Sequence, residues 1–233
     1  MMHRQTVTHT GRWTWWASTA GGILSAALIS QGSKAAPNPV APPLFHASFE
    51  TNALDKTPDD FLVLDGAFAV KEEGGNKFLR LPGAPLDTFG VLFGPTEGAG
   101  LAVTARIHGS AKGRRFPTFA VGLNGVGGYK LQVSPAKKLL ELYRGDEVLA
   151  SEPFTWESGT WTTLRLQTHK VKDGEIQVQG KAWKQGDPEP KEWQISHAER
   201  TEAPPGRPSV WGMPYAGTPI DFDDLLVTRA GGS

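Results

Sequence analysis

The sequence contains no cysteine among its 233 residues. A chain without cysteine has no disulfide, no thiolate nucleophile, no cysteine-linked lipid and no c-type haem attachment. It also has no Asn-x-Ser/Thr acceptor for an N-glycan. Its 24 basic and 24 acidic residues leave no net charge. Because no basic stripe is present, nucleic acid is not an expected partner.

Motifs of the common catalytic classes are absent as well. The sequence has no Gly-x-Ser-x-Gly elbow, no His-Glu-x-x-His, no phosphate-binding loop and no dinucleotide fingerprint. The histidines beyond residue 36 are scattered singly, which argues against a transition-metal site; they are His46, His108, His169 and His197. No catalytic residue is identified from the sequence.

The one long uncharged apolar stretch lies near the N-terminus and runs from Trp13 to Ile29. Arg4 and Arg12 precede it, and small residues surround Ala36. This pattern predicts a signal peptide over residues 1–36 and an exported protein, periplasmic or extracellular. The alternative is a retained anchor, but a spanning helix needs about 20 predominantly apolar residues. After cleavage we expect no membrane contact.

Short alternating segments fill the rest of the chain. After a Pro-rich spacer (37–43), segments such as Tyr129–Val133, Thr162–Thr168 and Glu175–Gly180 alternate apolar and polar residues between turn signals. Such segments are half-buried strands, and this spacing is typical of an all-β sandwich or barrel. We predict a single antiparallel β-sandwich of about a dozen strands over residues 44–229, followed by a tail (230–233).

The order of several motifs resembles the concanavalin A-like lectin/glucanase sandwiches, including the laminin-G-like and keto-disaccharide-hydrolase-like domains of exported bacterial proteins. The matching segments are Phe49-Glu50, Gly128–Val133, Leu140–Leu142, Trp156–Leu166 and Phe222–Val227. The resemblance implies a jelly roll that binds a carbohydrate or a cell-envelope glycan. The paired Glu-x-Asp-x-Glu carboxylates of its glucanases are missing.

We therefore expect an exported, non-catalytic carbohydrate-binding or extracellular interaction module. A glycoside hydrolase or lyase whose catalytic groups meet only in space is the first alternative. A structural envelope protein is the second.

The last predicted strand carries a possible metal site. Strict alternation over Ile220–Val227 puts either Asp223 or Asp224 beside apolar neighbours, where a carboxylate needs a cation or hydrogen-bond donors. The resemblance implies a structural calcium held by Asp223, Asp224 and Glu50. The alternative is that the carboxylate accepts hydrogen bonds from backbone amides.

A polar sheet face is the first predicted binding surface. Trp183 is in phase with Gln177, Gln179 and Lys181, and the preceding strand adds Arg165 and Gln167. An outward indole among amides and a guanidinium suits a sugar ring. A β-bulge at Gly180 would instead turn Trp183 into the core.

Other aromatic residues divide into two groups. Trp211 and Tyr215 are predicted to lie in a Pro/Gly loop before the last strand and to contribute to ligand binding. Trp156, Trp161 and Trp193 stand at strand edges and are predicted to be core or corner residues.

Overall fold

The computed structural model describes residue 11, residues 42–83 and residues 87–231. The predicted signal peptide and most of the spacer lie outside the described residues. Within the described ranges, no helix is long and apolar enough to cross a membrane.

Fifteen strands make up the described part of the chain. They are β1 (Phe45–Ala47), β2 (Leu62–Asp65), β3 (Ala69–Glu73), β4 (Asn76–Leu81), β5 (Phe89–Leu92), β6 (Leu101–Gly109), β7 (Thr118–Leu123), β8 (Tyr129–Ser134), β9 (Leu139–Arg144), β10 (Glu147–Pro153), β11 (Trp161–Lys172), β12 (Glu175–Lys184), β13 (Ile195–Glu199), β14 (Ser209–Met213) and β15 (Ile220–Arg229). The all-β prediction is confirmed. The strand β10 was not predicted.

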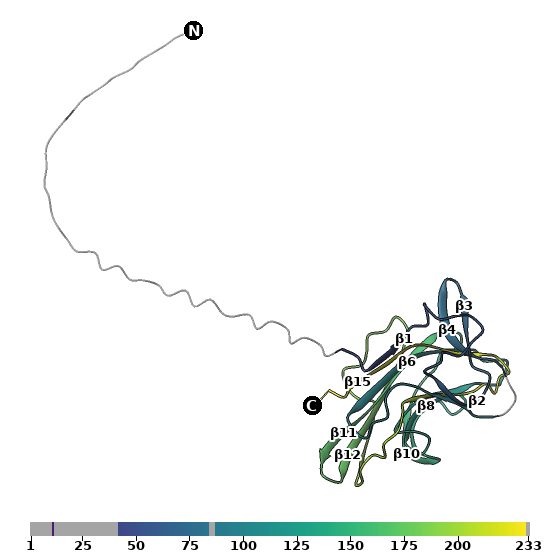
Figure 1. Cartoon of the computed structure of the whole chain (residues 1–233). Coiled ribbons are helices and arrows are strands. Elements are labelled where there is room, and N and C mark those ends of the chain that lie inside the picture. The colour runs from purple at the N-terminus through teal and green to yellow at the C-terminus, as the bar shows by residue number, and fades with distance from the viewer. Residues whose placement is uncertain (1–10, 12–41, 84–86, 232–233) are drawn as a thin grey trace, which may run out of the picture. The chain divides into compact units, whose positions relative to one another are not determined.

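The strands form two antiparallel sheets that pack face to face (Figure 1). The eight-stranded sheet has the order β13-β12-β11-β6-β15-β4-β3, and β1 also pairs with β15. The seven-stranded sheet has the order β10-β9-β8-β7-β14-β5-β2. The first and last strands therefore lie side by side in one sheet.

The core lies between the sheets and takes alternate residues from nearly every strand. The strand β6 shows this, because Leu101, Val103, Ala105 and Ile107 are at most 1% exposed while Thr104 and Arg106 face outward. The largest rings in the core include Phe49, Phe93, Phe119, Phe222 and Tyr129. Since burying side chains of this kind is the main driving force of folding, the outward positions are the ones left for other roles.

The strand β15 departs from the predicted strict alternation. Its pairing with β6 shifts register between Asp223 and Leu226, and Asp224 has a positive φ of 48°. This β-bulge inserts a residue, so that Phe222, Leu225 and Val227 are all fully buried. The predicted alternation through Asp224 and Leu226 is therefore wrong. The shift falls where the neighbour of β15 changes from β4 to β1.

The pairing of β12 with β11 is regular at Gly180, where a β-bulge was the alternative prediction. Gly180 pairs with Leu166 in an unbroken ladder, and Trp183 keeps the phase of Gln179. The predicted outward phase of Trp183 is confirmed. Gly180 faces the core, because a Cβ there would lie 2.5 Å from a methyl group of Leu131.

Candidate functional site

The first candidate surface is the outer face of the eight-stranded sheet. It brings together four predicted binding residues, which are Trp183, Arg165, Gln167 and Gln179. The ladder sets Arg165 opposite Lys181 and Gln167 opposite Gln179, and Gln167 Nε2 donates a hydrogen bond of 2.9 Å to Gln179 Oε1. The sequence thus predicted the membership of this face correctly.

The centre of that face is covered by the chain itself. The connection between β12 and β13 folds back so that the ring centroid of Trp193 lies 4.5 Å from Lys181 Nζ. Lys181 Nζ also forms a 2.8 Å ion pair with Glu189, and Arg165 pairs with Glu189 at 3.2 Å. The two positive charges expected to meet a ligand therefore share one carboxylate within the protein, that of Glu189.

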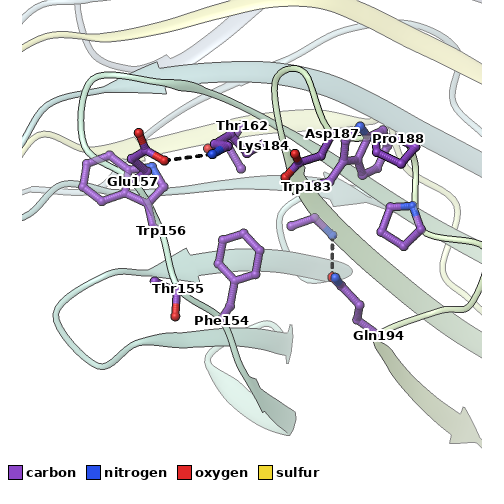
Figure 2. A pocket seen from close by; sticks show the side chains of 12 residues that line it. Phe154, Thr155, Trp156, Glu157, Thr162, Trp183, Lys184, Asp187, Pro188 and Gln194 are labelled. Atoms are coloured by element: carbon purple, nitrogen blue, oxygen red, sulfur yellow. Dashed lines mark hydrogen bonds and ion pairs between the residues drawn. The ribbon is translucent and has the colours of Figure 1, made fainter.

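Trp183 borders a pocket of about 570 Å³ at one end of this face (Figure 2). The pocket lies between the connection that precedes β11 and the connection that follows β12. Phe154 and Trp156 line it from the first of these connections. An ion pair of 3.1 Å joins Lys184 to Glu157 at the pocket. This arrangement leaves Trp183 partly exposed beside other aromatic rings.

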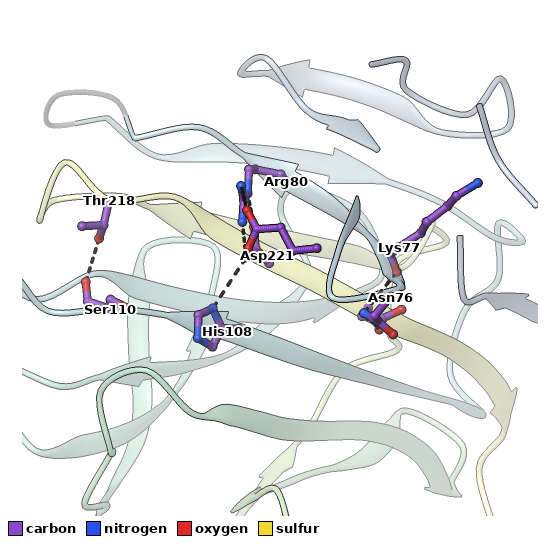
Figure 3. Close-up of polar contacts among 9 residues, drawn as sticks. Asn76, Lys77, Arg80, His108, Ser110, Thr218 and Asp221 are labelled. Carbon is purple, nitrogen blue, oxygen red and sulfur yellow. Dashed lines mark hydrogen bonds and ion pairs between the residues drawn. The ribbon is translucent and has the colours of Figure 1, made fainter. Parts of the chain in front are cut away.

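A charged cluster occupies the part of the same face formed by β4, β15 and β6 (Figure 3). The carboxylate of Asp221 receives Arg80 Nε at 2.6 Å and Arg80 Nη2 at 2.9 Å, while His108 Nδ1 lies at 3.6 Å. Contact with Asp221 raises the pKa of His108, although burial opposes this. Burial would raise the pKa of Asp221, but Arg80 and His108 lower it overall. Arg80 also forms a 2.6 Å ion pair with Glu73, so its guanidinium joins two carboxylates.

Trp161 lies over this cluster and not in the core. Its ring centroid lies 5.4 Å from that of His108 and 5.1 Å from the Arg106 guanidinium carbon. A cavity of about 410 Å³ opens beside it. A core position is wrong for Trp161 and for Trp193, which covers Lys181, and the corner role stays a prediction for both. The prediction is confirmed for Trp156, whose ring packs edge-on against Phe119 at 6.1 Å.

The acidic residues proposed as calcium ligands have protein partners. Asp223 Oδ2 accepts hydrogen bonds from Arg106 Nη2 at 2.7 Å and Asn76 Nδ2 at 3.1 Å, and Asp223 Oδ1 accepts one from the Asp224 amide. Burial nevertheless raises the pKa of Asp223.

The other two proposed ligands lie in separate contacts. Asp224 forms a 2.7 Å ion pair with Arg106, whereas exposed Glu50 accepts a hydrogen bond from the Lys77 amide. Across residues 42–83 and 87–231, no three His, Asp or Glu side chains are placed to hold a metal ion. Asp223 accepts hydrogen bonds as the alternative required, but two of its donors are side chains and only the Asp224 amide belongs to the backbone. Calcium stays a prediction.

The second candidate surface is the outer face of the seven-stranded sheet, where Trp211 lies flat. Trp211 was predicted to lie in a Pro/Gly loop, but it belongs to the strand β14. It stands opposite Gly90 and Ala120 on the neighbouring strands. A Cβ built on Gly90 would be 2.5 Å from both Cε3 and Cζ3 of the indole and 3.0 Å from Cδ2. These distances place that position directly above the ring, so the indole rests face-down on the Gly90 backbone.

A second glycine completes this arrangement. A Cβ on Gly122 would meet Ser209 Oγ at 2.3 Å and Trp211 Nε1 at 3.2 Å. Trp211 Nε1 donates a 2.8 Å hydrogen bond to Ser209 Oγ, so the indole nitrogen is already satisfied. We call Trp211 with its small neighbours Gly90, Ala120, Gly122 and Ser209 the Trp211 platform. What the platform can offer a ligand is chiefly the outer ring face.

Polar side chains stand next to the platform on β8 and β9. Lys130 Nζ lies 5.6 Å from the Trp211 ring centroid and 5.2 Å from that of Tyr143. Glu141 is buried and binds Ser134 and, at 2.9 Å, Lys137. Burial would raise the pKa of Glu141, but these two donors lower it. A pocket of about 260 Å³ lies between Trp211, Lys130 and the β7–β8 turn.

Sequence reasoning found Trp211 and missed the residues around it. Lys130, Tyr143, Gly90 and Gly122 come from four different strands, so no local spacing connects them. The only available signal was a glycine inside a strand, which often marks a close approach. Tyr215 is 47% exposed in the turn beyond β14 and does not line the pocket next to Trp211.

Comparison with known proteins gives fold relatives only. No protein-family model and no curated protein matches the sequence. Among solved structures, the carbohydrate-binding module CBM66 from Bacillus subtilis is 12% identical, covers 73% of this chain and 96% of its own, and has a TM-score of 0.50. The metal-free Emp46p carbohydrate recognition domain is 12% identical over 77% and 93%, with a TM-score of 0.54. The PL-14 alginate lyase from Aplysia kurodai is 11% identical over 82% and 100%, with a TM-score of 0.50.

The fold resembles the concanavalin A-like lectin/glucanase sandwich. At these identities the likeness concerns the fold alone. The resemblance inferred from the sequence is confirmed at that level. Because this fold supports both binding proteins and enzymes, function has to be argued from the site.

We expect Asp223→Ala to lower the free energy of unfolding by about 1–3 kcal/mol, because it leaves Asn76 and Arg106 donors unpaired. Denaturant unfolding measures the loss, with Asp224→Ala as the more exposed comparison. A chelator added to the wild-type protein tests calcium, since loss of a bound ion lowers the melting temperature. An Asp223→Ala variant as stable as the wild type would contradict both interpretations.

We expect the His108–Asp221 contact to make stability depend on pH. Because the folded-state pKa of His108 is raised, its contribution is full below the ordinary value of about 6.5 and is lost as pH rises through the folded pKa. Urea unfolding from pH 5.5 to 8.5 should show this decline in the wild type and a flatter profile in His108→Gln. Identical profiles would mean that the contact contributes nothing.

Proposed function

We propose that this protein binds saccharide through the Trp211 platform, outside the cytoplasm and without catalysing a reaction. The observation that supports this is the flat indole, whose inner face rests on Gly90 and whose nitrogen is satisfied by Ser209. A pyranose has an apolar face of its own that can cover such a ring, as aromatic side chains favour large apolar contacts.

The placement of the platform adds a second argument. Small residues flank Trp211 on β5 and β7, and the side chain that stands over its ring is Lys130, with Nζ 5.6 Å from the centroid. The Trp183 face has its central cations paired with Glu189 and covered by Trp193. We therefore favour the Trp211 platform, and saccharide binding by the Trp183 face stays a prediction.

Fold relatives are consistent with a saccharide ligand. CBM66 is described as a carbohydrate-binding module, Emp46p contains a carbohydrate recognition domain, and the PL-14 protein is an alginate lyase. The lyase keeps the catalytic alternative open. Analysis of the saccharide after incubation decides it, because a hydrolase or lyase releases shorter products and a binding module does not.

We expect Trp211→Ala to weaken saccharide binding by roughly tenfold or more, about 1.4 kcal/mol, and to keep the fold because the ring lies outside the core. Calorimetry or affinity electrophoresis with a polysaccharide panel measures binding, and thermal melting checks the fold. Gly90→Ala should also weaken binding, since the added Cβ lifts the indole.

Two variants serve as controls for this test. Gly98→Ala adds the same methyl group at ordinary contact distance, 3.5 Å from a backbone oxygen, and should leave binding unchanged. Trp183→Ala removes an indole from the other sheet and should do the same. Loss of binding in Trp183→Ala alone would move the site to the other face and overturn the proposal.

Export is proposed from the N-terminal sequence. We expect the mature chain to begin near Ala36 or Pro37, because small residues and the Pro-rich spacer meet there. N-terminal sequencing of the protein recovered from culture medium, periplasm and membrane fractions measures the start and the compartment. Membrane-bound protein that retains the first residues would contradict cleavage.

A further inference from the structure

Lys130 occupies an unusual position for an ammonium group. It projects from β8 between two aromatic rings, with Nζ 5.2 Å from the centroid of Tyr143 and 5.6 Å from that of Trp211. Its cross-strand partners are Gly122 and Tyr143. The lysine thus stands next to the Trp211 platform with its charged end toward the indole.

The ammonium group has no anionic partner among the described residues. Its contacts within residues 42–83 and 87–231 are with the two rings, whereas the lysines of the other sheet face, such as Lys181, are held by carboxylates. Burial lowers the pKa of Lys130, and the charge of Asp146, which lines the same pocket, only partly opposes this. A cation that is desolvated in this way gains more from an anion than a lysine in water does.

Other charged side chains on this face, such as Glu141 and Arg144, are paired with residues other than Lys130. Glu141 is held by Lys137 and Ser134, and Arg144 pairs with Glu199 at 2.9 Å. Asp146 lines the pocket but is exposed and forms no ion pair with Lys130 in the described part of the chain. The pocket therefore holds two charges without an ion pair among the described residues, the half-buried ammonium of Lys130 and the exposed carboxylate of Asp146, and it is the ammonium that lies over the indole.

We propose that the ligand is an acidic saccharide, and that Lys130 binds its carboxylate or sulfate group while the sugar ring stacks on Trp211. This inference rests on the proposed function and adds the ligand class to it. Lys130 Nζ lies over the indole, 5.6 Å from the ring centroid, so an anionic substituent of a sugar that covers the exposed part of the ring is within its reach. Hydrogen bonds between an ammonium and an anionic oxygen are about twice as strong as neutral ones.

The test compares three polysaccharides of similar length, which are a neutral glucan, a polyuronate and a sulfated glucan. Wild-type protein, Lys130→Met, Lys130→Arg and the control Lys191→Met are titrated with each at low and at physiological salt. Methionine keeps the apolar stem between the rings, and thermal melting confirms that each variant is folded. Lys191 is an exposed lysine on the connection that covers the other sheet.

We expect the wild type to prefer an acidic polymer to the neutral one by at least tenfold, and to bind it more weakly as salt is raised. Lys130→Met should lose this preference, while Lys130→Arg and Lys191→Met should keep it. The polyuronate and the sulfated polymer distinguish a carboxylate from a sulfate ligand.

Three results would overturn the inference. Equal wild-type affinity for neutral and acidic polymers would leave the proposed function intact and remove Lys130 from it. A preference retained by Lys130→Met would assign the anion to another group, and an equal loss on all three polymers would give Lys130 a role in shaping the site only. If no polymer bound the wild type and Trp211→Ala changed nothing, the proposed function itself would fall.

Discussion

Each strand of this sandwich gives one side of its backbone to the core between the sheets, and this constraint decides where any other chemistry can lie. Alternate residues of β6 are at most 1% exposed, and the inward positions of β8 and β11 are at most 2% exposed. Because side chains alternate along a strand, half of the positions remain outward. The candidate surfaces of the protein are therefore its two outer sheet faces and the loops at their ends.

The charged side chains of the two outer faces have different kinds of partner. On the eight-stranded sheet, Arg80 pairs with Asp221, Arg106 pairs with Asp223, and Lys181 pairs with Glu189. Half-buried charges of this kind need partners, since an unpaired one costs much more than the pair gains. The charged groups of this face are thus engaged within the protein, even though the sequence pattern of the face is that of a binding surface.

On the seven-stranded sheet, the neighbours of Trp211 are small and Lys130 lies between rings. Glycine inside a strand weakens it, because it packs no side chain and has more backbone entropy to lose. Gly90 and Gly122 nevertheless stand on both sides of one indole, where any larger residue would displace it. A local weakness of the sheet is consistent with a surface shaped for a ligand.

The sequence by itself determined the fold class and the strand periodicity, because these depend on alternation within single strands. Alternation also indicated the outward phase of Trp183, but only the unbroken β11–β12 ladder excluded a bulge at Gly180. The bulge at Asp224 depends on β15 changing its neighbour from β4 to β1, and no pattern within Ile220–Val227 contains that information. The cover formed by Trp193 and the platform under Trp211 were likewise decided only by tertiary structure. Both join residues from separate strands and connections, and their contacts arise only when the sheets assemble.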